Sequence, residues 1–494
     1  MPIELRMPFL RKTAPSFAFV FMLILAASSE AQVTLRKLST DTFTNSTSQH
    51  ATEVEPDTFA FGNTIVSAFQ VGRIFGGGGA DIGFATSTDG GRTWTSGFLP
   101  GITTFQGGGT ASAVSDASVT YDAAHGVWII CVLPISNNGN TVAVSRSTDG
   151  LTWSNPITVT TLGDPDKNWI VCDNTPTSPF FGHCYVEWDD TSLGDQEEMN
   201  TSTDGGLTWG PALQTADRTF GIGGQPLVQP SGTVIVPYEG LSGDMRAFTS
   251  TNGGASWTKS VHIANITDHV VAGGLRTSAL PSAEIDATGK IYVAWQDCRF
   301  RTACASNDIV MSTSANGATW TAPVRIPIDV TTSTVDHFIP GLGVDHATSG
   351  ASAHLTLAYY FYPTAKCTAA TCQLSVGVVR SVTGGTTWSA PRTLAGPMSL
   401  NSLPNTFSGL MVGDYISTSY VNGKAFPVFA VARAKVGTKF DEAMNTTPAG
   451  LAAALIGPEF SSRNDRPVPH AHSDHPKMQY YDLDHEHRIP PSKK

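Results

Sequence analysis

Charged residues with aromatic neighbours recur at widely spaced points along the 494-residue chain. Carboxyl groups at such points can exchange protons, Arg and Lys can hold an anionic group, and aromatic rings can stack on sugars. These residue types favour a carbohydrate-type site assembled from distant segments. The candidates are Arg73, Asp116, Lys167, Glu239, Arg276, Arg299, Arg301, His337, Asp414 and Tyr415.

Each candidate also has a purely structural interpretation. An Asp just before a strand often caps a turn, and an Arg between neighbouring sheets often forms an ion pair. The set is therefore stronger evidence for a functional face than any one member.

A repeated segment indicates which elements position these residues. Its first copy spans 87–94 and reads Ser-Thr-Asp-Gly-Gly-Arg-Thr-Trp. Further copies end at Trp153, Trp209, Trp257, Trp320 and Trp388, with Asn252, Asn316 and Thr383 in place of the Asp in the last three. The tryptophans that end consecutive copies lie 48 to 68 residues apart. Repeats of similar length are typical of solenoids, propellers and arrays.

The repeated segment has the chemistry of a β-hairpin turn. The Asp or Asn side chain can accept hydrogen bonds from backbone N–H groups inside the turn, and Gly supplies a positive φ. The Thr and Trp then begin a strand, where the indole can fill a gap between packed sheets. The pattern predicts an all-β fold.

This segment resembles the Asp-box, or bacterial neuraminidase repeat, of the sialidase-type β-propellers. The resemblance spans about residues 50–435. It implies that each box joins the third and fourth strands of a four-stranded blade, on the face away from the active site. The box is structural in that family and occurs on propellers of several functions.

Counting hydrophobic strands gives seven blades, although sialidases proper have six and six stays open. We expect second strands at 64–70, 127–133, 184–188, 233–238, 290–295, 353–360 and 424–432, and inner strands starting near Asp57, Asp116, Lys167, Gln225, Leu280, Ile339 and Met411. The last blade, 410–436, lacks a box and an evident outer strand. The alternating segment 32–39 can supply that strand and close the ring.

Two sets of loops should lie on the face opposite the boxes. The crossings between blades, which open onto the central channel, carry Glu55-Pro56-Asp57, Asp116, 164–169, 224–226, 276–278, 336–338 and 413–415. The loops between second and third strands carry 70–73, 188–190, 238–240 and 296–301. The candidates named above fall in these loops.

A true sialidase, by the same resemblance, holds the sialic acid carboxylate with three arginines. It uses a Tyr nucleophile activated by a Glu, and an Asp as acid and base. The first arginine lies in a Phe/Tyr-Arg-Ile-Pro motif. This chain departs there: Arg73-Ile74-Phe75 is followed by Gly76 and comes after the second strand, while 324–327 spells Val-Arg-Ile-Pro on an outer strand.

The remaining roles are assigned by position alone. Tyr415, beside Asp414, is the candidate nucleophile, with Glu239 or Glu284 as its base and Asp116 or Asp81 as the acid. Arg276, Arg299 and Arg301 can form the cationic cluster, with Arg73, Lys167 and His337 as further substrate-binding candidates.

The sequence supports two classes of function. One is a secreted glycosidase acting on an acidic sugar, an exo-α-sialidase if the family role is kept. A polysaccharide lyase, using His337 and Lys167, belongs beside it. The other is a non-catalytic propeller that binds glycan or protein. The net charge of −11 without a basic patch argues against a nucleic-acid partner.

Residues 1–31 predict a cleaved secretory signal peptide: basic residues, an 11-residue apolar run at 17–27 and a Ser-Glu-Ala cleavage site before Gln32. We predict the propeller over 32–440 and a C-terminal extension over 441–494, whose polar, His-rich tail from about 463 is disordered. No other stretch is long and apolar enough to span a membrane, and we expect a monomer.

Cysteine spacing agrees with export. We expect disulfides between Cys172 and Cys184, Cys298 and Cys304, and Cys367 and Cys372, leaving Cys131 as a buried thiol. These spacings do not suit zinc. We expect no cofactor. Calcium is the one candidate ion, because Asp-rich loops supply oxygen ligands, although no EF-hand spacing supports it.

Overall fold

The computed structural model describes Met1 and residues 33–137, 139–452, 458–462 and 465–468. Contacts divide the chain into Met1–Gln32 and Val33–Lys494. The predicted signal peptide, Met1 apart, and nearly all of the predicted tail lie outside the described residues. Within them, no helix is long and apolar enough to cross a membrane.

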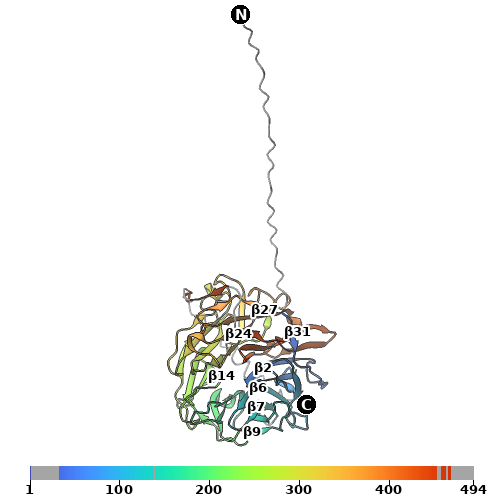
Figure 1. Cartoon of the computed structure of the whole chain (residues 1–494). Helices are drawn as coiled ribbons and strands as arrows, with labels where there is room; N and C mark the ends of the chain where they lie inside the picture. The colour runs from blue at the N-terminus through green and yellow to red at the C-terminus, as the bar shows by residue number, and fades with distance from the viewer. Residues whose placement is uncertain (2–32, 138, 453–457, 463–464, 469–494) are drawn as a thin grey trace. The chain divides into compact units, whose positions relative to one another are not determined.

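The described residues form an all-β structure of small antiparallel sheets, which follow one another along the chain (Figure 1). We call these successive groups of strands units 1 to 7. Units 1 and 2 belong to one sheet, because Gly79 of unit 1 pairs with Val114 of unit 2. Unit 1 holds β2 (Glu53–Phe61), β3 (Thr64–Arg73), β4 (Gly79–Ser87) and β5 (Thr95–Phe98), and unit 2 holds β6 (Ala113–Asp122), β7 (Val127–Ile135), β8 (Val142–Ser147) and β9 (Ile157–Thr160).

The next four units repeat this order of strands. Unit 3 holds β10 (Pro165–Cys172), β11 (Cys184–Asp190), β12 (Gln196–Ser202) and β13 (Leu213–Gln214). Unit 4 holds β14 (Gly221–Ile222) and β15 (Leu227–Val228), which both pair with β16 (Val234–Gly240), then β17 (Asp244–Ser250) and β18 (Val261–Asn265). Unit 5 holds β19 (Ser282–Ile285), β20 (Ile291–Asp297), β21 (Asp308–Ser314) and β22 (Val324–Arg325), and unit 6 holds β23 (Asp336–Val344), β24 (Leu355–Tyr362), β25 (Gln373–Ser381) and β27 (Arg392–Ser399).

Unit 7 combines the two ends of the described chain. It holds β30 (Ser417–Val421), β31 (Lys424–Val436), β32 (Lys439–Thr446) and β1 (Arg36–Lys37). Arg36 of β1 pairs with Thr446 of β32, so a strand from the N-terminal end completes this sheet, as the segment 32–39 predicts. The sequence pattern missed β32, and the predicted boundary at 440 falls inside it.

The six boxes lie between the third and fourth strands of units 1 to 6 and form the expected turns. In the second box, the Asp149 carboxylate accepts hydrogen bonds from the N–H groups of Leu151 and Thr152 at 2.8 and 2.7 Å. The hydroxyl of Ser147 accepts from the N–H of Gly150 at 2.8 Å. The sixth box reproduces the turn with Thr383, whose hydroxyl accepts from the N–H of Thr387 at 2.8 Å.

Each box packs against the preceding unit. Gly150 of unit 2 lies against Val66 and Thr86 of unit 1, and the Thr86 hydroxyl donates to the Gly150 carbonyl at 2.6 Å. The box of unit 1 packs in the same way against unit 7: a Cβ added to Gly91, whose φ is +83°, would lie 2.2 Å from the Phe426 ring. The first strands show the same order, because β2 contacts both β6 and β30.

All seven expected second strands are present, as β3, β7, β11, β16, β20, β24 and β31. Their apolar residues form buried clusters between neighbouring units; one cluster joins Tyr185 of unit 3 to Val236 and Phe248 of unit 4. The three predicted disulfides are formed, and Cys131 is buried as a free thiol.

Two short pairs lie outside the seven units. They are β26 (Trp388–Ser389) with β34 (Glu459–Phe460), and β28 (Asn405–Thr406) with β29 (Gly409–Leu410), while β33 (Leu451–Ala452) pairs with β31.

Candidate functional site

A bulge recurs near the start of the first strands and presents charged residues at one place. The register between first and second strands shifts in units 1, 2, 3 and 6. At each shift one residue has a left-handed backbone: Glu55, Asp116, Lys167 and Ile339, with φ between 44° and 56°. A non-glycine residue in this conformation costs about 1–2 kcal/mol, so the surrounding structure must impose it.

Three of these bulge residues meet in a buried ionic cluster. The Lys167 ammonium lies 2.7 Å from a carboxylate oxygen of Asp414, 3.3 Å from one of Asp116 and 3.6 Å from one of Glu55. Arg276 donates to both oxygens of Asp414, at 2.8 and 2.5 Å. We call Glu55, Asp116, Lys167, Arg276 and Asp414 the central cluster; each is no more than 5% exposed.

Burial and pairing pull the pKa values of the central cluster in opposite directions. Burial would raise the pKa of Asp414, but Arg276 and Lys167 hold it well below its usual range. Burial would lower the pKa of Lys167, but its carboxylate neighbours raise it above the usual value. Glu55 is different: burial outweighs Lys167 and raises its pKa to about 7. A carboxyl group that titrates near neutrality can both accept and give a proton.

Tyr415 lies beside this cluster. The Lys167 ammonium is 5.6 Å from the centre of its ring, and the Trp169 ring packs edge-on against it at 5.0 Å. Its hydroxyl lies 3.5 Å from the Ala117 carbonyl. Burial, followed by the charges of Glu55 and Asp116, raises its pKa well above the usual value, so the phenol is protonated at neutral pH.

The central cluster is closed to ligands of any size. The cavity lined by Asp116, Lys167 and Tyr415 measures only about 20 Å³. The segment 405–411, which includes β28 and β29, passes against the cluster: the Leu410 carbonyl accepts from the N–H of Arg276 at 2.8 Å. The same segment reaches unit 1, where Gln49 exchanges two hydrogen bonds with the backbone of Asn405.

Arg73 borders the central cluster from β3. Its guanidinium donates to the Gly78 carbonyl at 2.5 Å and to the Met411 sulfur at 3.1 Å. Burial, and then the charge of Arg276, lowers its pKa to about 10. The structure thus brings Arg73, Asp116, Lys167, Arg276, Asp414 and Tyr415 together among the residues predicted from the sequence.

Three other predicted residues have different partners. Arg301 pairs with Asp308 and Asp329, at 2.5 and 2.6 Å, and the His337 imidazole lies 3.9 Å from Asp329. Arg299 pairs with Asp297 at 2.6 Å. These arginines are therefore held by acids of their own neighbourhood.

Glu239, the predicted base, lies on β16 and pairs in register with Ile222 of β14. Glu55, in place of the predicted Glu239, is the glutamate whose charge acts on Tyr415. Glu55 stands in the predicted first crossing, and the sequence pattern predicts that the first strand starts near Asp57. That pattern has no signal for the bulge between the two residues. Asp166 was also missed; burial and then Asp116 raise its pKa.

A second acidic pair lies between units 3 and 4 and has no cationic partner in the described structure. Glu187 of β11 and Glu197 of β12 are buried and interact with each other. Burial raises the pKa of Glu197 to about 8, and burial together with Glu197 raises that of Glu187 well above its usual value. The Glu197 carboxyl group is therefore mostly protonated at neutral pH.

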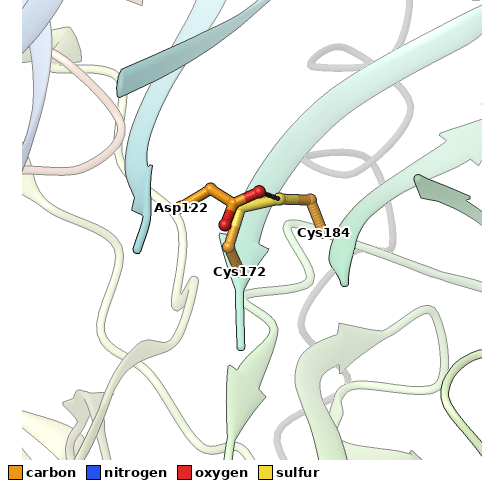
Figure 2. Close-up of side chains that lie close together, drawn as sticks. All are labelled: Asp122, Cys172 and Cys184. Atoms are coloured by element: carbon orange, nitrogen blue, oxygen red, sulfur yellow. Dashed lines mark hydrogen bonds between the residues drawn. A yellow bond between two sulfur atoms is a disulfide. The ribbon is translucent and has the colours of Figure 1, made fainter. Parts of the chain in front are cut away.

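Two groups of residues in the described structure have the geometry to hold a metal, and other bonds occupy both. Figure 2 shows Asp122 beside Cys172 and Cys184, whose sulfurs are joined to each other at 2.03 Å. Bonded sulfurs offer no thiolate ligand. The second group is Asp308, Asp329 and His337, and both of its carboxylates are already paired with arginines. Neither group fits a resident metal ion.

No family model and no curated protein matches the sequence. Among solved structures, an ulvan lyase of polysaccharide lyase family PL25 superposes with a TM-score of 0.51 at 10% identity, over 88% of this chain and 100% of that chain. A protein of unknown function from Dyadobacter fermentans gives 0.43 at 15% identity, over 70% of this chain and 99% of the other. The Trypanosoma rangeli sialidase gives 0.43 at 11% identity, over 83% and 58%.

The likeness to the ulvan lyase shows a shared fold. The neighbours thus include sialidases and a polysaccharide lyase, but at these identities they do not decide the chemistry. That must be argued from the site.

Proposed function

We propose that the chain is an exported, carbohydrate-active β-propeller of seven blades, which are units 1 to 7. The order in which boxes pack supports a ring, since the box of unit 1 lies against Phe426 of unit 7. The pairing of β1 with β32 supports closure by the N-terminal strand. Three disulfides support an oxidising compartment.

Export requires that the predicted signal peptide be removed. We propose cleavage after Ala31, so the mature chain starts at Gln32. The mass of the N-terminal peptide of the exported protein tests this proposal; a mature chain that still carries residues 1–31 would contradict it.

The substrate we propose is a glycan that carries an acidic sugar. The observation that carries this proposal is the seat of the Asp414 carboxylate, which Arg276 and Lys167 hold with three short contacts of 2.8, 2.5 and 2.7 Å. A guanidinium fork beside an ammonium is a carboxylate-binding arrangement. A sugar carboxylate can bind there when the segment 405–411 moves and Asp414 gives up its place.

The reaction we favour is hydrolysis of the glycosidic bond through a Tyr415 intermediate. Tyr415 attacks the anomeric carbon while Glu55 takes the phenolic proton, and Asp116 gives a proton to the leaving oxygen. Water then attacks the anomeric carbon and breaks its bond to the Tyr415 oxygen. Asp116 takes a proton from this water, and Glu55 returns a proton to Tyr415. The pKa of Glu55, about 7, suits this exchange.

A lyase at the same place is supported by the protonated state of Tyr415. Arg276 and Lys167 would neutralise a uronate carboxylate, Glu55 would remove the adjacent C–H proton, and Tyr415 would protonate the leaving oxygen. His337 lies with Asp329 instead of the central cluster, so the lyase role proposed for it from the sequence has no support.

A non-catalytic glycan-binding propeller is favoured by one observation. The charges of the central cluster are paired within the chain, and the adjoining cavity of about 20 Å³ is far smaller than a sugar. In that case the cluster would only hold the first strands together.

The test is turnover by the full exported protein. We would offer a fluorogenic sialoside and, separately, uronate polysaccharides, and record fluorophore release and the ultraviolet absorbance of unsaturated uronate. Hydrolysis predicts fluorophore release and elimination predicts absorbance, each lost in Tyr415→Phe. Tyr360→Phe is the matched control, because that buried hydroxyl also donates to a backbone carbonyl, Ala430, at 2.8 Å. No turnover of any substrate would overturn the enzyme proposal.

A further inference from the structure

A second cavity lies beside the first strands, towards the ends that carry the boxes. It measures about 440 Å³, within the range of small-molecule sites. Every unit contributes to its wall, from Asp57 of unit 1 to Ser417 of unit 7. We call it the box-side cavity.

The wall between this cavity and the central cluster is thin. Trp169 and Gln225 line both cavities, and the Gln225 side chain is fixed by accepting from the N–H of Ala283 at 2.7 Å. Trp169 packs edge-on against Tyr415 on the cluster side. The box-side cavity therefore has a polar and aromatic floor that is already held in place.

The ionisable groups of the box-side cavity are mostly acidic. Asp57, Glu284 and Asp286 line it, with His346 at its edge, and no Lys or Arg is among the lining residues. Asp286 is occupied with the backbone of its own turn and with Gly350. Glu284 has only the His346 imidazole, at 3.5 Å, as an ion-pair partner among the described residues, and that imidazole is half exposed.

Asp57 is the buried acid of this cavity. It accepts from the N–H of Val119 at 2.8 Å, and burial raises its pKa to about 7. A cation placed beside it would favour the ionised form. The rest of the wall is largely apolar, with Phe59, Trp169, Pro226 and Leu227.

We propose that the box-side cavity binds a small organic ammonium on an apolar body. The ammonium would lie between Asp57 and Glu284, and the Trp169 ring offers a cation–π contact and an apolar face. The apolar body fills the remainder of the cavity. An anionic ligand is disfavoured, because it would meet acids with no lysine or arginine to offset them.

Three probes that differ in one group test this site. Calorimetric titration of the full exported protein with benzylamine, benzyl alcohol and benzoate separates charge from shape. We expect benzylamine to bind about tenfold more tightly than benzyl alcohol, because only the ammonium can form a charge-assisted hydrogen bond with the carboxylates. Benzoate should not bind. Equal binding of the alcohol, tighter binding of benzoate, or no binding of benzylamine would each overturn the proposal.

Two variants locate the bound amine. Glu284→Gln and Asp57→Asn should each weaken benzylamine about tenfold, and Asp441→Asn, an exposed change on β32, should leave its affinity unchanged. Glu284→Gln keeps the test valid if Asp57→Asn fails to fold, since Glu284 is partly exposed. Retained affinity in Glu284→Gln and every folded Asp57 variant would place the amine elsewhere and overturn the proposal. The outcome does not depend on turnover at the central cluster.

Discussion

The central cluster and the box-side cavity lie beside the same strands and have opposite character. Glu55 and Asp57 are two residues apart on β2, yet Glu55 belongs to the central cluster and Asp57 lines the box-side cavity. On β10, Lys167 of the central cluster lies two residues from Trp169, which borders both regions. In the central cluster the acids pair with Lys167 and Arg276, and the adjoining cavity of about 20 Å³ is too small for a sugar. In the box-side cavity the acids meet no Lys or Arg and space is present.

The four bulges separate the effect of the backbone from the effect of the charges. Ile339 has the same left-handed backbone as Glu55, Asp116 and Lys167 but carries no charge. The bulge is thus a feature of the first strand, and the ionic cluster is an addition at three of its positions. Because buried charges are costly unless paired, the stability of the protein should be sensitive to single changes in the central cluster. It should tolerate single changes in the box-side cavity.

Removing a cation from the central cluster should produce the largest effect. Lys167→Met leaves Asp116, Asp414 and Glu55 short of a partner, and we expect the free energy of unfolding to fall by about 3–5 kcal/mol. Urea unfolding measures this. The matched change in the box-side cavity, Glu284→Gln, should alter the free energy of unfolding by no more than about 0.5 kcal/mol. Similar losses in the two variants would remove the contrast between the regions.

Removing the disulfide beside the box-side cavity should lower the free energy of unfolding somewhat less. Cys172, which lines the box-side cavity, is bonded to Cys184 across β10 and β11. We expect the variant with both cysteines changed to Ser to lose about 2–4 kcal/mol of unfolding free energy. Benzylamine affinity should fall with it, while pairing in the central cluster persists. If the amine still bound with wild-type affinity, Cys172 would not shape the cavity.

The acidic pair between units 3 and 4 offers a pH-dependent comparison of smaller size. The folded pKa of Glu197 is about 8, above its ordinary value of 4.5. Its contribution to stability is therefore present below 4.5 and is lost as the pH rises through 8. Glu197→Gln should be more stable than the wild-type protein at about pH 9, and the gain should disappear in acid. A pH-independent difference in urea midpoint would show that the charge is not the cause.

The smallest effect should come from a box. The Asp149 carboxylate accepts backbone N–H groups, which lower its pKa from 3.8 to about 2. That contribution is present above 3.8 and is lost as the pH falls through 2. Asp149→Ala should lower the melting temperature slightly, and Asp149→Asn should restore most of it, because Asn252 and Asn316 serve in other boxes. An Asn variant as unstable as the Ala variant would contradict this.

Much of the fold can be predicted from the sequence, because a recurring sequence pattern marks most of its turns between third and fourth strands. Six boxes mark the third-to-fourth-strand turns, and the second strands are continuous apolar runs. The sequence pattern does not predict β32, because unit 7 has no box of its own to mark its third strand. The sequence of β32 is Lys-Phe-Asp-Glu-Ala-Met-Asn-Thr, and its first three residues are not buried. The N-terminal strand was foreseen because an incomplete sheet needs a partner.

The candidate site was predictable in part. Lys167, Arg276 and Asp414 lie in the predicted crossings, within or shortly before the first strands of their units, and that position brings them together. The pattern cannot tell which acid neutralises which base: Arg299 is held by Asp297, two residues before it. Nor could it foresee the bulge that places Glu55 beside Tyr415, or the closure of the cluster. The sequence does not predict the box-side cavity, because the resemblance implies a site on the opposite face.

The most direct test is the position of an acidic sugar. We would determine a crystal structure of the exported protein with sialic acid or glucuronate and with benzylamine at saturation. Our interpretation predicts the sugar carboxylate on Arg276 and Lys167, with Asp414 displaced, and the amine between Asp57 and Glu284. An acidic sugar bound in the box-side cavity, with Asp414 still seated on Arg276, would contradict it.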